Sequence, residues 1–235
     1  MISHYDWAGG REAMLRFGPA GAPVVVAALP LFEEANRTRA LVVTILRALA
    51  AQGIGAALPD LPGTGESLVP VEAVTLADWR AAFAASVTML GDESGPVHAI
   101  SVRGGALVET EAPVRSRWQL GPATGESVVR ELLRARAIAE PGTSLDFDPT
   151  APAPAGPPIE IAGNQVPRKL LADLAAAMPP IGARIRVVRL GRDRGVFDRK
   201  IDVPSPWRRA EPENDATLAE QLTDDIALWV RSCAG

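Results

Sequence analysis

Residues 96–108, PVHAISVRGGALV, decide the fold class of the chain. The apolar run at 97–100 predicts a short buried strand. The segment Ser101-Val102-Arg103-Gly104-Gly105 then predicts a tight turn, and a helix is expected to begin at 106–108. Small residues are needed where a strand and a helix approach each other this closely, and the paired glycines supply them.

The same turn has an arginine where chemistry would need a nucleophile. Strand, glycine turn and helix form the frame of the G-x-S-x-G motif, whose central serine attacks carbonyl carbons. Matched to that motif, Ser101 and Gly105 take the outer positions and Arg103 takes the position of the serine. A guanidinium stays protonated in proteins and cannot act as a nucleophile. The alternative interpretation is an ordinary strand–helix turn that carries a surface arginine.

Composition restricts the class of protein. The 235 residues, of which 47% are hydrophobic, suit one domain spanning residues 1–235 with a sizeable core. A net charge of -4 and a pI near 5.3 argue against nucleic-acid binding. The chain has no apolar run of about 18 residues and no signal-peptide pattern, so we expect a cytoplasmic protein without a membrane span. The single cysteine, Cys233, excludes an internal disulfide and a cysteine-based metal cluster.

Strand and helix patterns alternate along the chain, which favours an α/β protein with a mainly parallel sheet and helices on both faces. Two features qualify this pattern. Alternating arginines, Arg115 and Arg117, indicate that the strand expected at 114–120 lies nearer an edge or is open at its start. Residues 140–158 contain six prolines and predict an extended linker or excursion, with no long helix and no folded lid domain. Strands are expected at 3–17 (a hairpin), 23–29, 54–58, 97–100, 114–120, 159–162 and 183–190, and helices at 37–52, 75–90, 125–139, 167–178 and 217–229.

Four segments together resemble a known family. They are 30–39 (PLFEEANRTR), 60–67 (DLPGTGES), 101–107 (SVRGGAL) and the stretch from Trp118-Gln119 through Gly125 to 132–134. This set is similar to the α/β-hydrolases, and within them to the exosortase A system-associated hydrolases of the second type, which are serine-aminopeptidase-like. In that group arginine already replaces the serine of the elbow. The group is associated with exopolysaccharide production and exosortase-dependent sorting in Gram-negative bacteria.

The resemblance assigns roles to particular residues. It implies an elbow at Arg103, with Ser101, Val102, Gly104 and Gly105 around it. It implies a structural loop and a pocket near the elbow. The loop residues are Asp60, Gly63, Gly65 and Ser67, and the pocket candidates are Phe32, Glu33, Glu34, Asn36, Arg37, Trp118 and Gln119.

A working triad would need serine, then a carboxylate, then histidine in chain order. No histidine follows the elbow, because the two histidines of the chain are His4 and His98. The acid position expected after the 159–162 strand contains Asn164 and no carboxylate. All three catalytic roles are therefore expected to be vacant. We expect structural roles for Ser101, Ser67 and Cys233, a solvated role for Asp146 and Asp148, and no metal or cofactor.

Three functions remain open at this point. The first is a catalytically degenerate hydrolase homologue, a pseudoenzyme that acts as a binding or accessory protein for an unknown small molecule or peptide. The second is an ester or peptide hydrolase with a non-standard mechanism, in which Glu33 or Glu34 activates water. The third is an assembly or scaffold protein that binds copies of itself or a protein partner.

The sequence also predicts a contact for Arg103. The loop at 30–36 leaves a strand at the edge of the sheet where the elbow lies. An unpaired buried guanidinium is costly, so Arg103 needs an anionic partner. Glu33 and Glu34 are the nearest candidates by topology, and we expect a charge-assisted bond to one of them. The alternative is an arginine that extends into solvent.

Overall fold

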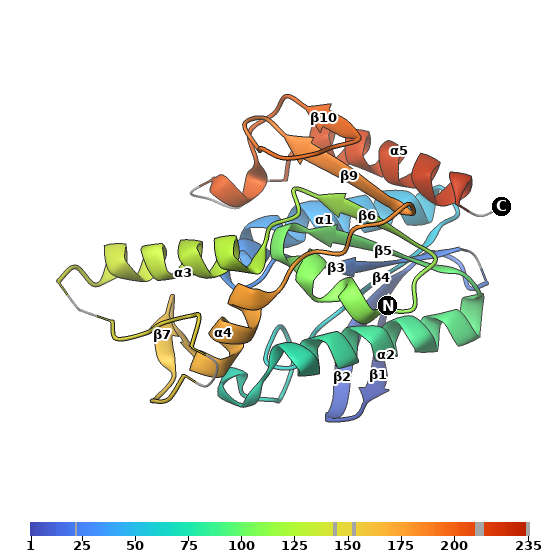
Figure 1. Cartoon of the computed structure of the whole chain (residues 1–235). Coiled ribbons are helices and arrows are strands. Elements are labelled where there is room, and N and C mark those ends of the chain that lie inside the picture. The colour runs from blue at the N-terminus through green and yellow to red at the C-terminus, as the bar shows by residue number, and fades with distance from the viewer. Residues whose placement is uncertain (22, 143–144, 152–153, 210–213, 234–235) are drawn as a thin grey trace.

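A computed structural model describes residues 1–21, 23–142, 145–151, 154–209 and 214–233. Its centre is an eight-stranded sheet in the order β1-β2-β4-β3-β5-β6-β9-β10 (Figure 1). The pairs β1–β2 and β2–β4 are antiparallel, and all pairs from β4 to β10 are parallel. The strands are β1 Ile2–Trp7, β2 Gly10–Phe17, β3 Val24–Ala28, β4 Gly55–Pro59, β5 Val97–Val102, β6 Ser116–Leu120, β9 Ile185–Leu190 and β10 Arg199–Ile201. The expected mainly parallel α/β sheet is confirmed.

Helices cover both faces of this sheet. The α1 and α5 helices pack against each other on one face, and α2 lies on the other with α3 and α4 beside it (Figure 1). The bounds are α1 Glu33–Ala51, α2 Leu76–Ser94, α3 Gly125–Ala139, α4 Arg168–Ala176 and α5 Ala216–Ser232. Thr75 caps α2 in a reciprocal capping box with Asp78, as its sequence predicts.

The central strand β3 shows how the sheet separates two cores. Val24, Val26 and Ala28 point into the core under α2, whereas Val25 and Ala27 point into the core under α1 and α5. All five residues of β3 are buried, which is why the strand is apolar throughout instead of alternating with polar residues.

The segment after the elbow differs from the prediction. Instead of a helix beginning at Ala106, two 3₁₀ turns follow, Arg103–Leu107 and Glu109–Glu111. Only thirteen residues separate β5 from β6, and Pro113 lies among them. The chain must cross to a parallel neighbouring strand within that length, which leaves no room for a full α-helix.

Two predicted strands take other places. β6 lies between β5 and β9, away from the edges of the sheet. Arg117 is accommodated there because its guanidinium donates to the carbonyls of Glu109, Thr110 and Ala112. The strand expected at 159–162 does not join the sheet either. β7 Ile159–Ile161 pairs with β8 Asn164–Val166 in a separate antiparallel hairpin whose turn includes Gly163.

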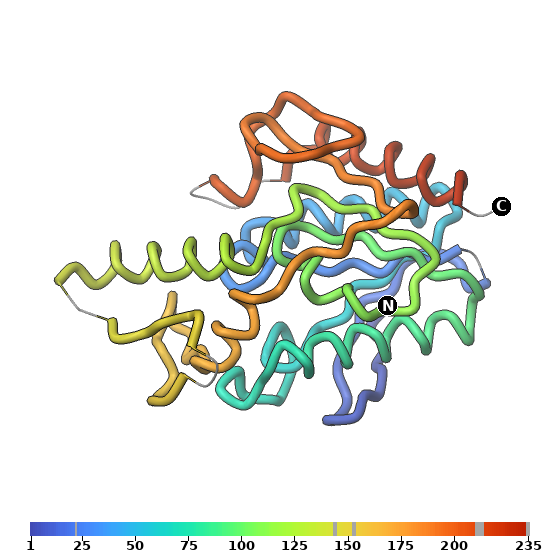
Figure 2. Tube along the Cα trace, viewed as in Figure 1, coloured from blue at the N-terminus to red at the C-terminus, as the bar shows by residue number. Residues whose placement is uncertain are grey.

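The proline-rich stretch runs from the far end of α3 back to this hairpin (Figure 2). Its described residues, 140–142, 145–151 and 154–158, form no helix or strand. The remaining four, 143–144 and 152–153, lie outside the described residues. In the described parts of the chain, no helix has the length and apolar character needed to cross a membrane.

Candidate functional site

The backbone at Arg103 has the shape of a nucleophile elbow. Its φ of 54° lies in the left-handed region, which a side-chain-bearing residue occupies only where the surrounding structure holds it. Gly105 follows because the carbonyls of Ala28 and Leu29 are too close for a larger residue; a Cβ there would lie 2.4 Å from the Ala28 oxygen. A strained and closely packed turn therefore follows β5, with Arg103 at its apex.

The Arg103 side chain is buried and bound on several sides. Its Nε donates to both oxygens of Glu34, at 3.3 and 3.4 Å, and one terminal nitrogen donates to Glu131 at 2.7 Å. The guanidinium carbon lies 5.4 Å from the centre of the Trp207 ring. The expected ion pair is present with Glu34. Glu33 pairs with Arg37 instead.

Glu34 is held in an unfavourable environment for a charge. Burial raises the pKa of its carboxyl, the Arg103 guanidinium opposes that shift, and Glu131 adds to it. Glu34 lies in the first turn of α1, while Glu131 lies on α3. Two carboxylates from separate helices thus share one guanidinium at the carboxyl ends of the parallel strands.

Side chains from the segments that follow β9 and β10 also lie near Arg103. β9 is the strand that follows β6 in the sheet, and Asp193 lies buried just after it. A Cβ on Gly121 would lie 3.0 Å from the Trp207 ring and 3.2 Å from an Asp193 oxygen, so these side chains meet at one point. The position at 163–167, where the sequence led us to look for an acid, does not follow a strand of the main sheet, because β7 pairs with β8 in a separate hairpin. Ser205 and Trp207 follow β10, and no histidine lies in that segment.

A buried carboxyl, that of Glu109, lies next to the elbow and bonds to residues of β5 and β6. Glu109 accepts hydrogen bonds from Ser101 and from the amide of Gln119, both at 2.9 Å. Its other oxygen has no partner among the described residues. Burial raises the pKa of Glu109 to about 7, although these hydrogen bonds and Arg117 oppose the shift. Ser101 thus has the expected structural role.

Two predicted pocket residues lie inside the protein instead. Gln119 is buried against Glu109, and Trp118 packs in the core under α1 and α5 and donates to Asp225 at 2.7 Å. Consecutive residues of a strand point to opposite faces of the sheet, so Trp118 and Gln119 lie in the two cores that flank β6.

A cavity of about 370 Å³ lies beside the elbow. Its apolar wall includes Phe32, whose φ is 56°, and the edge-packed ring of Trp79. The predicted Glu33 and Asn36 also line it, as does Asn164 of the small hairpin. Arg103 does not line it. Leu31 lines it and also lies close to the elbow, since a Cβ on Gly104 would lie 3.1 Å from the Leu31 side chain.

The predicted structural loop forms one side of this cavity. Asp60 accepts the Glu66 N–H at 3.2 Å and faces Arg39 at 3.4 Å. Gly65 is required because a Cβ would lie 2.4 Å from the Asp60 carboxyl. Ser67 accepts from the N–H groups of Gly63 and Val69 and donates to Glu12. These bonds and the close approach at Gly65 hold the loop at 60–67 in one conformation.

The histidines and the cysteine lie elsewhere. His98 is buried in β5 with its Nδ1 2.8 Å from Ser116, and burial lowers its pKa to about 4. His4 is exposed on β1, at the opposite edge of the sheet, and the carbonyl of Cys233 accepts from Arg115. Among the described residues, no group of three or more histidine, cysteine or acidic side chains could hold a metal ion.

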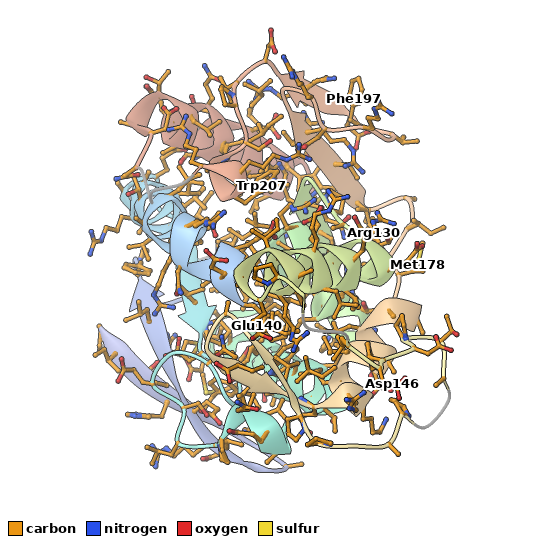
Figure 3. The ribbon with its side chains drawn as sticks, turned by 90° about the vertical axis from the view of Figure 1, so that its left-hand side faces the viewer. Arg130, Glu140, Asp146, Met178, Phe197 and Trp207 are labelled. Carbon is orange, nitrogen blue, oxygen red and sulfur yellow. The ribbon has the colours of Figure 1, made fainter. Side chains whose placement is uncertain are left out.

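Sequence reasoning missed Glu131, Asp193 and Trp207. Figure 3 looks onto this end of the molecule and shows Trp207 above α3. A signal for Asp193 was present, because Gly163 marks a hairpin turn that removes 159–162 from the sheet. No local pattern distinguishes Glu131 from the other acidic residues of α3.

No protein-family model and no curated protein sequence matches the chain. Solved structures do resemble it. Est1E from Butyrivibrio proteoclasticus is 14% identical with a TM-score of 0.64, over 99% of this chain and 98% of that one. A thermophilic esterase from Thermogutta terrifontis is 12% identical, with a TM-score of 0.59 over the whole of both chains.

A third structure, XC6422 from Xanthomonas campestris, is described as an α/β serine hydrolase without a lid. It is 13% identical with a TM-score of 0.57, over 99% of this chain and 94% of that one. Together with the parallel sheet and the strained turn after β5, these likenesses show that the chain has the α/β-hydrolase fold.

Proposed function

We propose that this protein is a catalytically degenerate hydrolase homologue that binds a small molecule or peptide. In this proposal residues 1–235 act as one domain, and the elbow is a closed structural element. The resemblance of the loop at 30–39 to exosortase-associated hydrolases supports a place in exopolysaccharide-linked or sorting-linked processes of a bacterial cytoplasm.

One observation carries the proposal: the elbow apex is filled by a guanidinium with two carboxylate partners. Arg103 sits where a serine would attack, and Glu34 and Glu131 hold it there. The adjoining base position contributes the Trp207 ring, which has no proton-accepting nitrogen. Acyl transfer needs a nucleophile, a base and room for the tetrahedral intermediate, and this arrangement offers none of the three.

The neighbouring cavity supports a binding role. Its volume is within the range of small-molecule sites, and it combines aromatic walls with a few polar groups such as Asn36 and Arg39. Neither Arg103 nor its partners Glu34 and Glu131 line the cavity, so a molecule could bind there without contacting the ion pair.

A turnover assay with short-chain nitrophenyl esters tests the absence of catalysis. We expect the native protein to be no faster than its heat-unfolded form. The rival hydrolase has Glu33 or Glu34 as a base. Turnover that survives Arg103→Ala but is lost in Glu33→Gln or Glu34→Gln, and is retained in the exposed control Glu126→Gln, would establish the enzyme and overturn the proposal.

A gain-of-function variant tests the interpretation of the vacant positions. The double substitution Arg103→Ser and Trp207→His would put a nucleophile and a base beside the existing Asp193. We expect this variant to show a burst of nitrophenol that the single Arg103→Ser does not show. Equal rates for the double and single variants would mean that Asp193 and residue 207 are not at triad positions.

A further inference from the structure

The charge of the chain is unevenly distributed. Residues 184–209 hold nine arginines and lysines but only three aspartates, in a protein whose net charge is -4. The rest of the molecule is therefore strongly acidic. Within the basic stretch, Asp193 is buried and Asp198 accepts from the Val187 N–H at 2.7 Å. Asp198 and Asp202 are exposed, but the exposed cations outnumber them; these are Arg184, Arg192, Arg194, Lys200 and Arg208.

Hydrogen bonds constrain the backbone of the turn between β9 and β10, residues 191–198 (the β9–β10 loop). Asp198 exchanges hydrogen bonds with Val187 on both sides of the loop base. Arg189 donates to the Val196 carbonyl at 3.0 Å. Gly195, with φ of 112°, allows the loop to fold onto that arginine, because a Cβ would lie 2.8 Å from its guanidinium. Its outer side chains are thus presented by a constrained backbone.

Two apolar side chains stand at the outer end of this loop. Val196 is 88% exposed and Phe197 is 47% exposed. Phe197 lies at the outer margin of the molecule in Figure 3, well away from Trp207. Arg192, Arg194 and Lys200 flank them in the chain and are also exposed, and Lys200 lies 5.7 Å above the Phe197 ring. Arg192 and Arg194 form no ion pair with any described residue.

We propose that the β9–β10 loop docks this protein onto an anionic lipid surface. Val196 and Phe197 would enter the headgroup region, while Arg192, Arg194 and Lys200 would contact lipid phosphates. The exposure of the apolar pair favours this partner, because exposed apolar side chains insert into lipid without needing a matching groove, and the flanking cations complement negative headgroups. Such attachment is peripheral and reversible, which agrees with the lack of a spanning helix in the described parts of the chain.

The loop leaves β9 at the carboxyl end of the sheet, the same edge at which Arg103 lies. Docking through it would hold that edge toward the lipid surface. The inference does not depend on the proposed absence of catalysis, because an enzyme and a binding protein would dock alike.

Co-sedimentation of the full chain with lipid vesicles tests the proposal. We expect binding to vesicles of equimolar phosphatidylcholine and phosphatidylglycerol, weakening steeply with salt, and little binding to pure phosphatidylcholine. Arg194→Glu should lower the partition coefficient about tenfold and Phe197→Ser about fivefold. Matched controls are Arg11→Glu, on β2 near the opposite edge of the sheet, and Leu228→Ser, an exposed leucine on α5; neither should change binding.

Several results would overturn the proposal. One is failure to bind anionic vesicles, and another is equal binding to both vesicle types. A Phe197→Ser variant that binds as well as the native protein would reduce the contact to nonspecific charge attraction. Tighter, Phe197-dependent binding to an oligonucleotide or to polyglutamate would assign the loop to a nucleic acid or an acidic protein instead. Thermal melting of each variant checks that the fold is retained.

Discussion

Two clusters in this molecule join arginines to carboxylates, and the pKa of the carboxyl group shifts in opposite directions in the two. On the α5 side, Asp225 accepts from Arg186 through two bonds of 2.8 Å, from Arg199 at 2.8 Å and from Trp118 at 2.7 Å. At the elbow, Glu34 receives only the two longer contacts from Arg103. The residue types are alike, but the number and length of the bonds differ.

The difference appears in proton affinity. Burial alone would raise the pKa of Asp225, but the bonds from Arg186, Trp118 and Arg199 outweigh it and lower the pKa to about 2. At the elbow burial prevails, so the pKa values of Glu34 and of Glu109 below it are raised. The Asp225 cluster therefore stabilises the fold, whereas the elbow keeps charged groups in a poorly solvated place. Groups with perturbed pKa values of this kind cluster at functional sites.

The largest expected effect is at Asp225. Asp225→Ala would leave two guanidinium groups and the Trp118 N–H without their acceptor, and should lower the free energy of unfolding by about 3–5 kcal/mol. Urea denaturation measures this change. The adjacent Asp224→Ala, on the exposed side of α5, should cost less than about 1 kcal/mol. Equal losses in the two variants would remove the contrast between the clusters.

The second effect is a pH dependence of stability at Glu109. Its folded pKa of about 7 lies above the ordinary value of 4.5, so the folded state binds more protons between these pH values. Stability contributed by this group should fall as pH rises through that window, by about 3 kcal/mol in total. Asp225 has the opposite sign: its contribution is present above about pH 4 and is lost toward pH 2.

Denaturation at several pH values checks this prediction in Glu109→Gln. The variant cannot titrate at this position, so it should gain stability relative to the native protein as pH rises from 4.5 to 7. Glu111→Gln, which is exposed on the same turn, serves as the control. A native-minus-variant difference that stays flat across this range would show that Glu109 does not titrate there.

A smaller effect is expected for Arg103→Ala. Glu34 loses its partner, but its side chain is 23% exposed and can reach water or take up a proton. With loss of the contact to Trp207, the free energy of unfolding should fall by about 1–2 kcal/mol. Thermal melting beside the surface control Arg130→Ala measures it. An unchanged melting temperature would show that the guanidinium contributes nothing to the fold.

The smallest effect should come from the outer carboxylate. Glu131 is 47% exposed, so solvent screens its bond to Arg103 despite the 2.7 Å distance. Glu131→Gln should change the unfolding free energy by less than about 1 kcal/mol. A loss as large as that of Arg103→Ala would mean that Glu131, and not Glu34, is the principal partner of the guanidinium.

Much of the elbow could be predicted from local sequence. The apolar run of β5 and the paired glycines fix a strand and a close turn. A buried guanidinium needs an anionic partner, and this requirement pointed to the loop at 30–36, which follows the strand β3 beside β5. Choosing Glu34 over Glu33 required the structure, because adjacent residues at a helix start point in different directions, and Glu33 turns toward Arg37 one helical turn later.

The sequence by itself determined the alternation of strands and helices, the placement of Arg103 at the turn and the absence of histidine after it. These depend on residue type and short-range periodicity. Only the tertiary structure decided that β7 leaves the sheet and that β9 follows β6. It also brought Asp193, Glu131 and Trp207 to the same edge. Strand order depends on which distant apolar faces pack together, and a short apolar run such as 159–161 satisfies a hairpin as well as a sheet.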